Sequence, residues 1–330
     1  MFVVAQADGY VREEAPNEHV DEYEITEELI GITPILPYID SDAMLASLSS
    51  TLMVTGRCTN VKESNAVNLF NLVGDADASP QALLDIQSLI NAVKPKRCFN
   101  PPVHIYKTSR SRLPDTLANI PGCRVPRVEA LDPADFAELT DLCRNFGCWP
   151  IIVRSRGHHG GKEMVLVNNE EGLVQLKDLE WPYHGVFIIE YLDYQQADGY
   201  FAKMRIAMIE GKSYARHCIY STDWAIHSES RSGIMLEDAE LRAQEKQTLQ
   251  EMRDKRLNDI KPTLDEIYRR IKLDVFGIDC TLIGNELVIF EANACMRFFT
   301  EDASTNPPFE YLEPYEGAVR TAVKKMLLKK

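Results

Sequence analysis

The side chains best suited to chemistry lie near the end of the chain, in two apolar segments joined by Gly284-Asn285. Asp279 stands in the first segment, and Glu291 and Asn293 stand in the second. The β-branched and aromatic residues on either side of a Gly-Asn turn predict an antiparallel hairpin. Two carboxylates and an amide oxygen make an all-oxygen ligand set that suits Mg²⁺. The hairpin therefore predicts a magnesium site, against the alternative of an ordinary hairpin with acids at its rim.

This metal site depends on the register of the hairpin. If three residues, 284–286, stay unpaired in the turn, Asp279 lies across from Glu291. A two-residue turn would instead place Asp279 opposite Phe290 and break the site. The magnesium interpretation therefore requires Asp279 and Glu291 to face each other.

The alternation of side chains along a strand bears on the same site. It predicts that Leu287, Ile289, Glu291 and Asn293 share one face of the second segment. Two carboxylates in one site repel each other unless a cation is bound. We therefore expect that replacing Asp279 or Glu291 by its amide leaves the cation-free protein no less stable.

Composition and charge limit the classes of function. The 330 residues, 45% of them hydrophobic and 26% charged, indicate an ordinary globular protein of two or three lobes. The formal charge of −14 argues against a nucleic-acid partner. The longest early apolar run, 29–39, contains two prolines and is too short to span a membrane. With eight cysteines in no C-x-x-C pair and no secretory leader at the start, we expect a cytoplasmic protein with reduced thiols.

A strand at 66–73, a helix at 80–93 and a strand at 97–99 predict a βαβ unit with a parallel sheet. Asp75 and Asp77 follow the first strand, where side chains can reach a ligand. Either they touch a substrate or they stabilise a turn, and the structural turn is the favoured interpretation.

Glycine and positive charge come together after another predicted strand. Arg154 ends that strand, and the Gly-rich loop 155–162 leads into the next one. Glycines let the backbone approach a bound group, and Arg156 and Lys162 add positive charge. His158-His159 is a weaker metal candidate, because adjacent side chains on an extended chain point in opposite directions. A phosphate-facing loop is therefore favoured.

A second hairpin is predicted at 201–209 and 212–220. On its first strand Lys203 and Arg205 share one face, which is unusual in a buried sheet. Either they form a surface ladder or they bind an anion. The remaining predicted elements are a strand at 185–192 and helical segments at 133–146, 236–271 and 308–329.

From about residue 126 to 329 the chain resembles the ATP-grasp superfamily, which includes D-Ala-D-Ala ligases and glutamate-adding ligases. The most specific part of the resemblance is the trio Asp279, Glu291 and Asn293. The resemblance implies an α/β (α+β) protein in which two α+β lobes grip a nucleotide, preceded by a smaller α/β pre-grasp lobe. The implied divisions are an N-terminal extension (1–60), the pre-grasp lobe (61–125), an ATP-grasp N-terminal lobe (126–192) and an ATP-grasp C-terminal lobe (193–330).

The resemblance also implies roles for individual residues. Asp279, Glu291 and Asn293 match the Mg²⁺ ligands, with Mn²⁺ as an alternative cation. Arg154 stands where the family usually has a phosphate-binding lysine, and Gly277 stands where it often has an arginine. The other implied ATP contacts are Gly160, Gly161 and Lys162 in the loop, Glu190, Tyr191 and Leu192 in the adenine hinge, Asp198 (with Asp193 as its alternative) for the ribose, and either Lys107 or Arg110 as the first cation.

Arg205 resembles the family's phosphate-facing arginine, and Lys203 and Arg297 are further candidates for catalysis. The implied reaction is ADP-forming ligation, in which ATP and Mg²⁺ activate a small-molecule carboxylate for attack by an amine. Arg297, or else Arg231 or His217, is a candidate contact for the substrate carboxylate. The alternatives are a small-molecule kinase and a nucleotide-binding regulatory module, and the intact metal trio argues against the second of these. A homodimer is left open, with no nucleic acid or membrane as partner.

Overall fold

The computed structural model describes residues 68–156, 163–179, 185–299 and 307–329, together with the backbone of four earlier strands. These strands are β1 (Phe2–Ala7), β2 (Tyr10–Glu13), β3 (Thr26–Leu29) and β4 (Ser49–Val54). β2 and β3 pair with each other, and the other described strands form three larger sheets. None of the helices in these ranges is long and apolar enough to cross a membrane.

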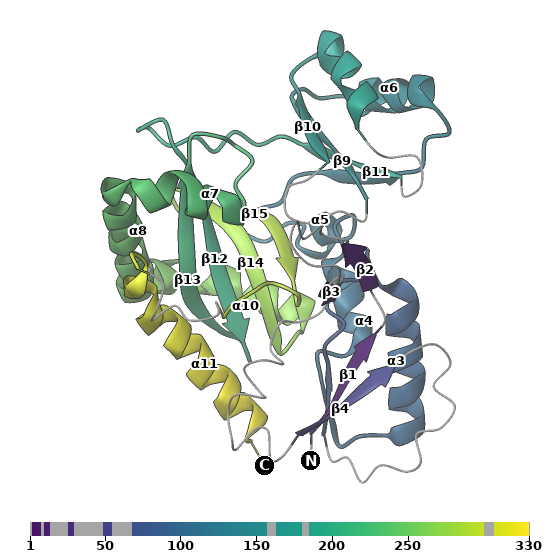
Figure 1. Ribbon diagram of the computed structural model, residues 1–330, viewed down its shortest axis with the longest axis vertical. Helices are drawn as coiled ribbons and strands as arrows, with labels where there is room; N and C mark the ends of the chain where they lie inside the picture. Colours follow the sequence, from purple (N-terminus) through teal and green to yellow (C-terminus); the bar gives the residue numbers. More distant parts are fainter. Residues whose placement is uncertain are drawn as a thin grey trace, which may run out of the picture.

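The first sheet is parallel, with the strand order β4-β1-β5-β6. β5 (Asn68–Asn71), α3 (Pro80–Val93) and β6 (Arg97–Phe99) confirm the predicted βαβ unit. The sheet crosses the boundary expected at residue 60, because β1 and β4 precede it and β5 and β6 follow it. Two short helices, α4 (Pro102–Ile105) and α5 (Leu113–Thr116), then lead to the second lobe (Figure 1).

The second sheet is antiparallel, with the order β10-β9-β11-β8, and lies at the top of Figure 1. α6 (Phe136–Asn145) packs on it, because Leu139 and Cys143 of the helix share one buried cluster with Ile151 and Val153 of the sheet. The four strands are β8 (Val128–Leu131), β9 (Ile151–Ser155), β10 (Met164–Val167) and β11 (Val186–Glu190).

The third sheet contains both predicted hairpins, in the order β13-β12-β14-β15-β7. Its first four strands are antiparallel neighbours, and β7 runs parallel to β15. The strands are β7 (Cys123–Arg124), β12 (Phe201–Ile209), β13 (Lys212–Ser221), β14 (Val275–Ile283) and β15 (Glu286–Asn293).

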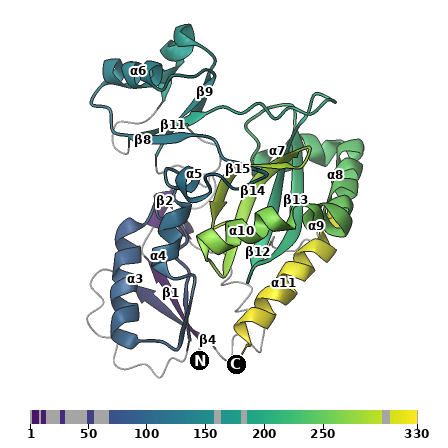
Figure 2. The same cartoon turned by 180° about the vertical axis from the view of Figure 1, so that it is seen from behind.

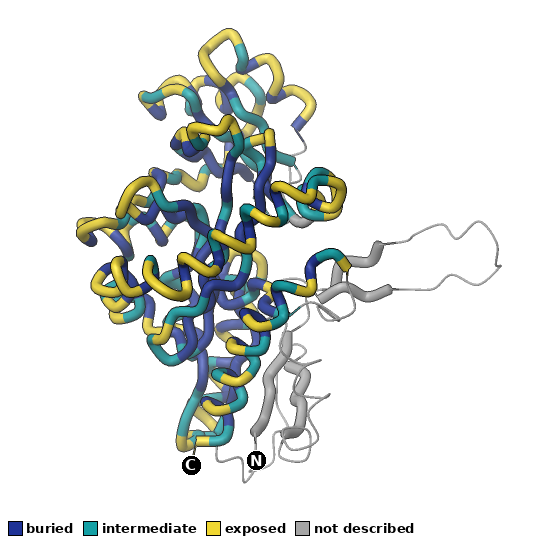
Figure 3. The backbone as a smooth tube through the Cα atoms, turned by 90° about the vertical axis from the view of Figure 1, so that its left-hand side faces the viewer, coloured by how far each residue is buried: buried dark blue, intermediate teal, exposed yellow. Residues whose placement is uncertain are grey.

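Helices cover both faces of the third sheet. The helices are α7 (Ser228–Ser230), α8 (Ala239–Glu251), α9 (Leu257–Asp259), α10 (Lys261–Ile271) and α11 (Glu313–Leu327). α10 lies behind the sheet in Figure 1 and in front of it in Figure 2, and it shares a core with Ile206 and Ile278. α11 packs through Val319 and Val323 into a second cluster. Buried residues, dark blue in Figure 3, therefore follow the strands.

A buried ion pair fastens α11 to the sheet. The pairing of β12 with β13 slips by one residue, so that Arg205 faces His217, Ile206 faces Ala215, and Arg216 is the extra residue of a β-bulge. The Arg216 side chain enters the core, where it lies 2.7 Å from the carboxylate of Glu316 and donates to the Phe298 carbonyl. Burial lowers the pKa of Arg216 to about 10, although the charge of Glu316 opposes this shift.

Replacing Glu316 by Gln should lower the free energy of unfolding by about 3–5 kcal/mol, because Arg216 then keeps its charge in the core without a counter-ion. The double change Arg216→Met and Glu316→Leu should cost less than this single change. Chemical denaturation followed by circular dichroism would compare them. Glu313→Gln removes a carboxylate from a partly exposed pair with Arg320 and is the control, with an expected loss below about 1 kcal/mol. An equal loss in the single and double variants would contradict the argument.

Candidate functional site

The hairpin that carries the acidic trio has a two-residue turn. Ile283 pairs with Glu286, and Gly284 takes the left-handed conformation (φ 64°) that such turns require. The three-residue turn was therefore the wrong prediction. Asp279 nevertheless pairs with Glu291, as the metal interpretation required.

A β-bulge reconciles the short turn with this pairing. Cys280 pairs with Ile289, whereas Asp279 pairs with Glu291, so Phe290 is an extra residue on β15. A bulge of this kind places two residues opposite one and shifts the register beyond it by one position. The turn alone would have separated the acids, and the bulge brings them back together.

The same bulge corrects the prediction that four side chains share one face. Leu287 and Ile289 are fully buried in the core beneath the sheet, whereas Glu291 and Asn293 line a pocket on the other side. Phe290 also reaches that pocket. The alternation of side chains between the two sheet faces is therefore shifted by one residue at the bulge. Without this shift, Glu291 and Asn293 would lie on the same buried apolar face as Leu287 and Ile289.

Asp279 is held by two cations of β12. Arg205 donates to both carboxylate oxygens, at 2.7 and 2.9 Å, and the ammonium of Lys203 lies 3.7 Å away. Burial acts to raise the pKa of Asp279, but the charges and hydrogen bonds of these two cations outweigh it and lower the pKa. Asp279 is thus a charged, compensated carboxylate.

Glu291 has a cation of its own, from the first lobe. Arg110 lies 3.3 Å from its Oε1 atom, and the Asn293 amide donates to the same oxygen at 2.6 Å. Burial again acts to raise the pKa of Glu291, and Arg110 is the main cause of its net lowering. The expected repulsion between the two acids is present but is outweighed, because each acid has its own counter-charge.

The donor set fits a hard divalent cation through its two carboxylates. Asp279 and Glu291 face each other across neighbouring strands and can offer oxygens to one ion. Asn293 as placed turns its amide NH₂ toward Glu291, while its oxygen accepts from the Cys295 backbone at 3.0 Å. It orients Glu291, and its amide would have to turn to become a third ligand. The described residues contain no cluster of three or more His, Cys, Asp or Glu side chains that could hold a metal.

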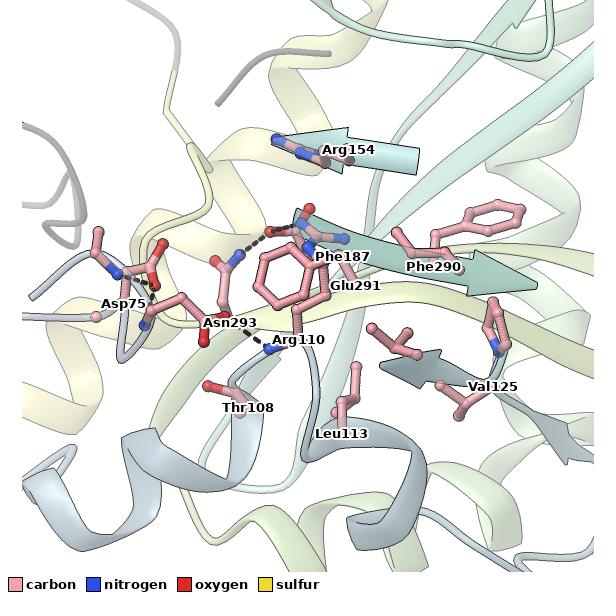
Figure 4. Close-up of a pocket in the computed structure, with 16 residues that line it drawn as sticks. Asp75, Thr108, Arg110, Leu113, Val125, Arg154, Phe187, Phe290, Glu291 and Asn293 are labelled. Carbon is pink, nitrogen blue, oxygen red and sulfur yellow. Dashed lines mark hydrogen bonds and ion pairs between the residues drawn. The ribbon is translucent and has the colours of Figure 1, made fainter. Parts of the chain in front are cut away.

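Glu291 and Asn293 lie at the polar end of a pocket between the three sheets, whereas Asp279, Lys203 and Arg205 are not among its lining residues. Figure 4 shows Asp75 and Asn293 on one side of Glu291 and Phe290 and Val125 on the other. The apolar end is lined by Leu113, Val125, Pro126, Val128, Phe187, Ile189 and Phe290. The polar end is lined by Asp75, Asp77, Thr108, Arg110, Arg154, Glu291 and Asn293. A flat apolar group joined to an anionic one would match this division.

The loop after β5 approaches the trio closely. A Cβ atom at Gly74 would lie 2.8 Å from backbone atoms of Ala294 and Cys295, so only glycine fits. Asp75 caps the turn by accepting from the Asp77 N–H at 2.7 Å, and Asp77 accepts from the Arg110 N–H at 2.7 Å. The favoured turn interpretation is confirmed for Asp75, whereas the Asp77 side chain links the turn to the segment that carries Arg110. Both acids also line the pocket, which their position after a strand had allowed.

Comparison with solved structures identifies the fold. The structure is similar to a RimK domain ATP-grasp protein from Sphaerobacter thermophilus, with a TM-score of 0.53, 9% identity and 100% of both chains covered. The chain has the ATP-grasp fold. It is likewise similar to the macrocyclase MdnC from Microcystis aeruginosa, solved with its precursor peptide MdnA (TM-score 0.53, 12% identity, 100% of this chain and 99% of that one). A D-alanine–D-alanine ligase from Coxiella burnetii gives a TM-score of 0.52 at 12% identity, covering 99% of this chain and 97% of that one. No family model matches the sequence, and neither does any curated protein.

Some of the cations predicted to bind phosphate line the pocket, and others do not. Arg154 and Arg110 both line it. Burial first, and then the charge of Arg110, lower the pKa of Arg154 to about 10, an environment suited to a bound anion. Lys107 instead donates to the Arg270 carbonyl at 2.8 Å, outside the pocket. Of the two alternatives for the first cation, the structure thus brings Arg110 to the site.

Other predicted contacts of the ATP-grasp site lie outside this pocket. Glu190 accepts from Arg124 at 3.3 Å, Tyr191 packs edge-on against Trp224, and Leu192 is buried. The ribose candidates also make local contacts, because Asp198 accepts from Gln244 and Asp193 from the Gln195 N–H. The Arg297 side chain is exposed, and its carbonyl accepts from Arg205. Arg231 pairs with buried Glu245, and His217 faces Arg205 across the strands. Gly160, Gly161 and Lys162 lie outside the described residues.

Sequence reasoning missed the apolar end of the pocket. Val128, Phe187, Ile189 and Phe290 look like ordinary strand residues, and only their convergence from three strands makes a binding wall. The one available signal was the position of Phe290 directly before Glu291.

Replacing Asp279 by Asn should lower the melting temperature of the ligand-free protein, opposite to the effect expected from repulsion alone. The loss should be about 1.5–3 kcal/mol at neutral pH, the usual worth of hydrogen bonds to a charged group. Because folding lowers the pKa of Asp279, its stabilisation is complete above a pH of about 4 and is lost as the pH falls through the folded-state pKa. The difference in melting temperature between the two proteins should be constant from pH 7 to about pH 4 and should shrink as the pH falls further. A difference that stays constant at lower pH would contradict the ion pairing.

Proposed function

We propose that the protein is an ATP-dependent ligase that joins a carboxylate to an amine or a related nucleophile and releases ADP and phosphate. The observation that carries this proposal is the pocket itself, in which an apolar wall leads to two arginines and to Glu291, whose cross-strand partner is Asp279. The ATP-grasp fold supports the nucleotide, and similar structures include a D-alanine–D-alanine ligase and a peptide macrocyclase.

The pocket offers surfaces that match the adenine and the phosphates of ATP. The adenine would lie against Phe187, Ile189 and Phe290, where burying its faces is favourable. Arg110 and Arg154 would bind the phosphates, since guanidinium groups match phosphate oxygens as a fork. When bound by Asp279 and Glu291, Mg²⁺ would supply positive charge that neutralises the phosphate oxygens.

The chemistry needs no covalent intermediate on the protein. An oxygen of the substrate carboxylate forms a bond to the γ-phosphorus as the bond to ADP breaks, which gives an acyl phosphate. The amine nitrogen then bonds to the acyl carbon, loses a proton, and inorganic phosphate leaves. Lys203 and Arg205, both on β12, lie beside Asp279 and would stabilise charge on the transferred phosphoryl group.

A screen of amino acids and small organic acids for ADP release tests the reaction. We expect release that depends on an acid, and hydroxamate formation when hydroxylamine replaces the amine, because hydroxylamine traps an acyl phosphate. Stable phosphorylation of the acid without trapping would indicate a kinase instead. Release of AMP and pyrophosphate would overturn the proposal.

Replacing Arg154 by Ala should lower kcat/KM for ATP by about 10- to 100-fold, mainly through a higher KM, because a charged hydrogen bond is worth about 1.5–3 kcal/mol. Arg154→Lys should restore only part of this, since an ammonium group cannot bind phosphate as a fork. Lys107→Ala is the control and should leave the ATP dependence unchanged, because Lys107 contacts the Arg270 carbonyl. An equal loss in both alanine variants would place the phosphates elsewhere.

A further inference from the structure

We propose that Asp279 and Glu291 act as internal counter-ions that hold Arg205 and Arg110 until nucleotide and divalent cation are both present. In this counter-ion exchange, Arg205 and Arg110 leave the carboxylates for the nucleotide phosphates, and the carboxylates pass to the cation. The inference rests on the proposed function and adds a regulation of the same site, namely that metal-free nucleotide binds poorly.

The contacts of Arg205 carry the argument furthest. Its Nε and Nη2 atoms donate to the two oxygens of Asp279, at 2.7 and 2.9 Å, and its Nη1 atom donates to the Arg297 carbonyl at 3.1 Å. The edge of the guanidinium that would bind a phosphate as a fork is therefore occupied by Asp279. Each oxygen of Asp279 accepts one of these bonds, so Arg205 can offer this edge to a phosphate only after it leaves Asp279.

Arg110 and Glu291 form a second, looser pair through a single contact. Arg110 lies 3.3 Å from Glu291, in the same pocket as Arg154, and its side chain is only 18% exposed. The Oε1 atom of Glu291 already receives both Arg110 and the Asn293 amide. Each carboxylate of the candidate metal site is thus paired with an arginine of the candidate phosphate site.

The charges make the two ligands depend on each other. If the arginines moved to phosphates without a cation, Asp279 would keep only Lys203 and Glu291 would lose Arg110, so the two facing carboxylates would repel each other across the strands. If the carboxylates bound a cation without nucleotide, Arg205 and Lys203 would lose their counter-charge in the same place. Among the states that have a ligand bound, only the one with both ligands leaves every charge with a partner, which is a positive coupling between the two binding sites.

The exchange predicts that a variant lacking a metal ligand gains affinity for metal-free nucleotide. Asp279→Asn should bind ADP in EDTA about 10- to 100-fold more tightly than the parent, because Arg205 no longer has to leave a carboxylate. Isothermal titration calorimetry with ADP, in EDTA and in Mg²⁺, measures the effect. The benefit of Mg²⁺ should shrink in the variant, and Glu291→Gln should behave similarly by releasing Arg110.

Two controls separate the exchange from simple repulsion of the nucleotide. Asp254→Asn removes a carboxylate from an exposed pair with Arg253 and should leave the affinity for ADP unchanged. In an Arg205→Gln background, Asp279→Asn should give little gain, whereas repulsion alone would give the same gain with or without Arg205. Melting curves establish that each variant is folded at the temperature of the titration.

The outcomes distinguish failure of the counter-ion exchange from failure of the proposed ligase function. If the parent binds ADP with Mg²⁺ but neither amide variant gains affinity in EDTA, the counter-ion exchange is overturned and the nucleotide site stands. A gain that persists without Arg205 overturns it as well. If the parent binds no adenine nucleotide under either condition, the proposed function itself fails.

Discussion

The structure depends most on one pairing, that of Asp279 with Glu291 across β14 and β15. A two-residue turn sets the register at one end of the hairpin, and without a bulge this register would pair Asp279 with Phe290 instead of Glu291. The bulge at Phe290 brings Asp279 and Glu291 back into register. It also directs the Phe290 ring and the Glu291 carboxylate into the same pocket. Because a shift of one residue exchanges the faces of a strand, the bulge decides both where the core ends and where the site begins.

Once two carboxylates share a buried place, charge dictates what surrounds them. Arg205 and Lys203 reach Asp279 from the neighbouring strand, and Arg110 reaches Glu291 from the segment that leads into α5. Gly74 allows the loop after β5 to approach the backbone after Asn293 within van der Waals distance. The ion pairs and the close backbone contact thus hold two lobes together at the point where the pocket opens, so the site is also part of the structure's frame.

The sequence predicted the elements and much of the charged site, but not the geometry that joins them. Strong β patterns and turn residues were enough for both hairpins and for the βαβ unit. Phe290 carries no mark of a bulge, because an aromatic residue fits a regular strand equally well. Lys107 and Arg110 could not be separated, since both lie on one short basic segment and only tertiary contacts send one to Arg270 and the other to Glu291. The apolar wall could not be predicted for a similar reason, because its residues come from three strands that are far apart in the sequence.

Gly277 shows how the protein departs from the pattern it resembles. An arginine is common at this position in the family, yet here an added Cβ atom would lie 2.5 Å from the sulfur of Met296. Met296 belongs to the cluster that also contains Ala207, the cross-strand neighbour of Gly277, so the space for a cation is filled by packed apolar groups. The positive charge on this face comes instead from Lys203 and Arg205, one strand away and beside Asp279. Arg205 and Lys203 thus reach Asp279 from the neighbouring strand, and in the proposed exchange the Arg205–Asp279 pair is the contact that must open when the ligands bind.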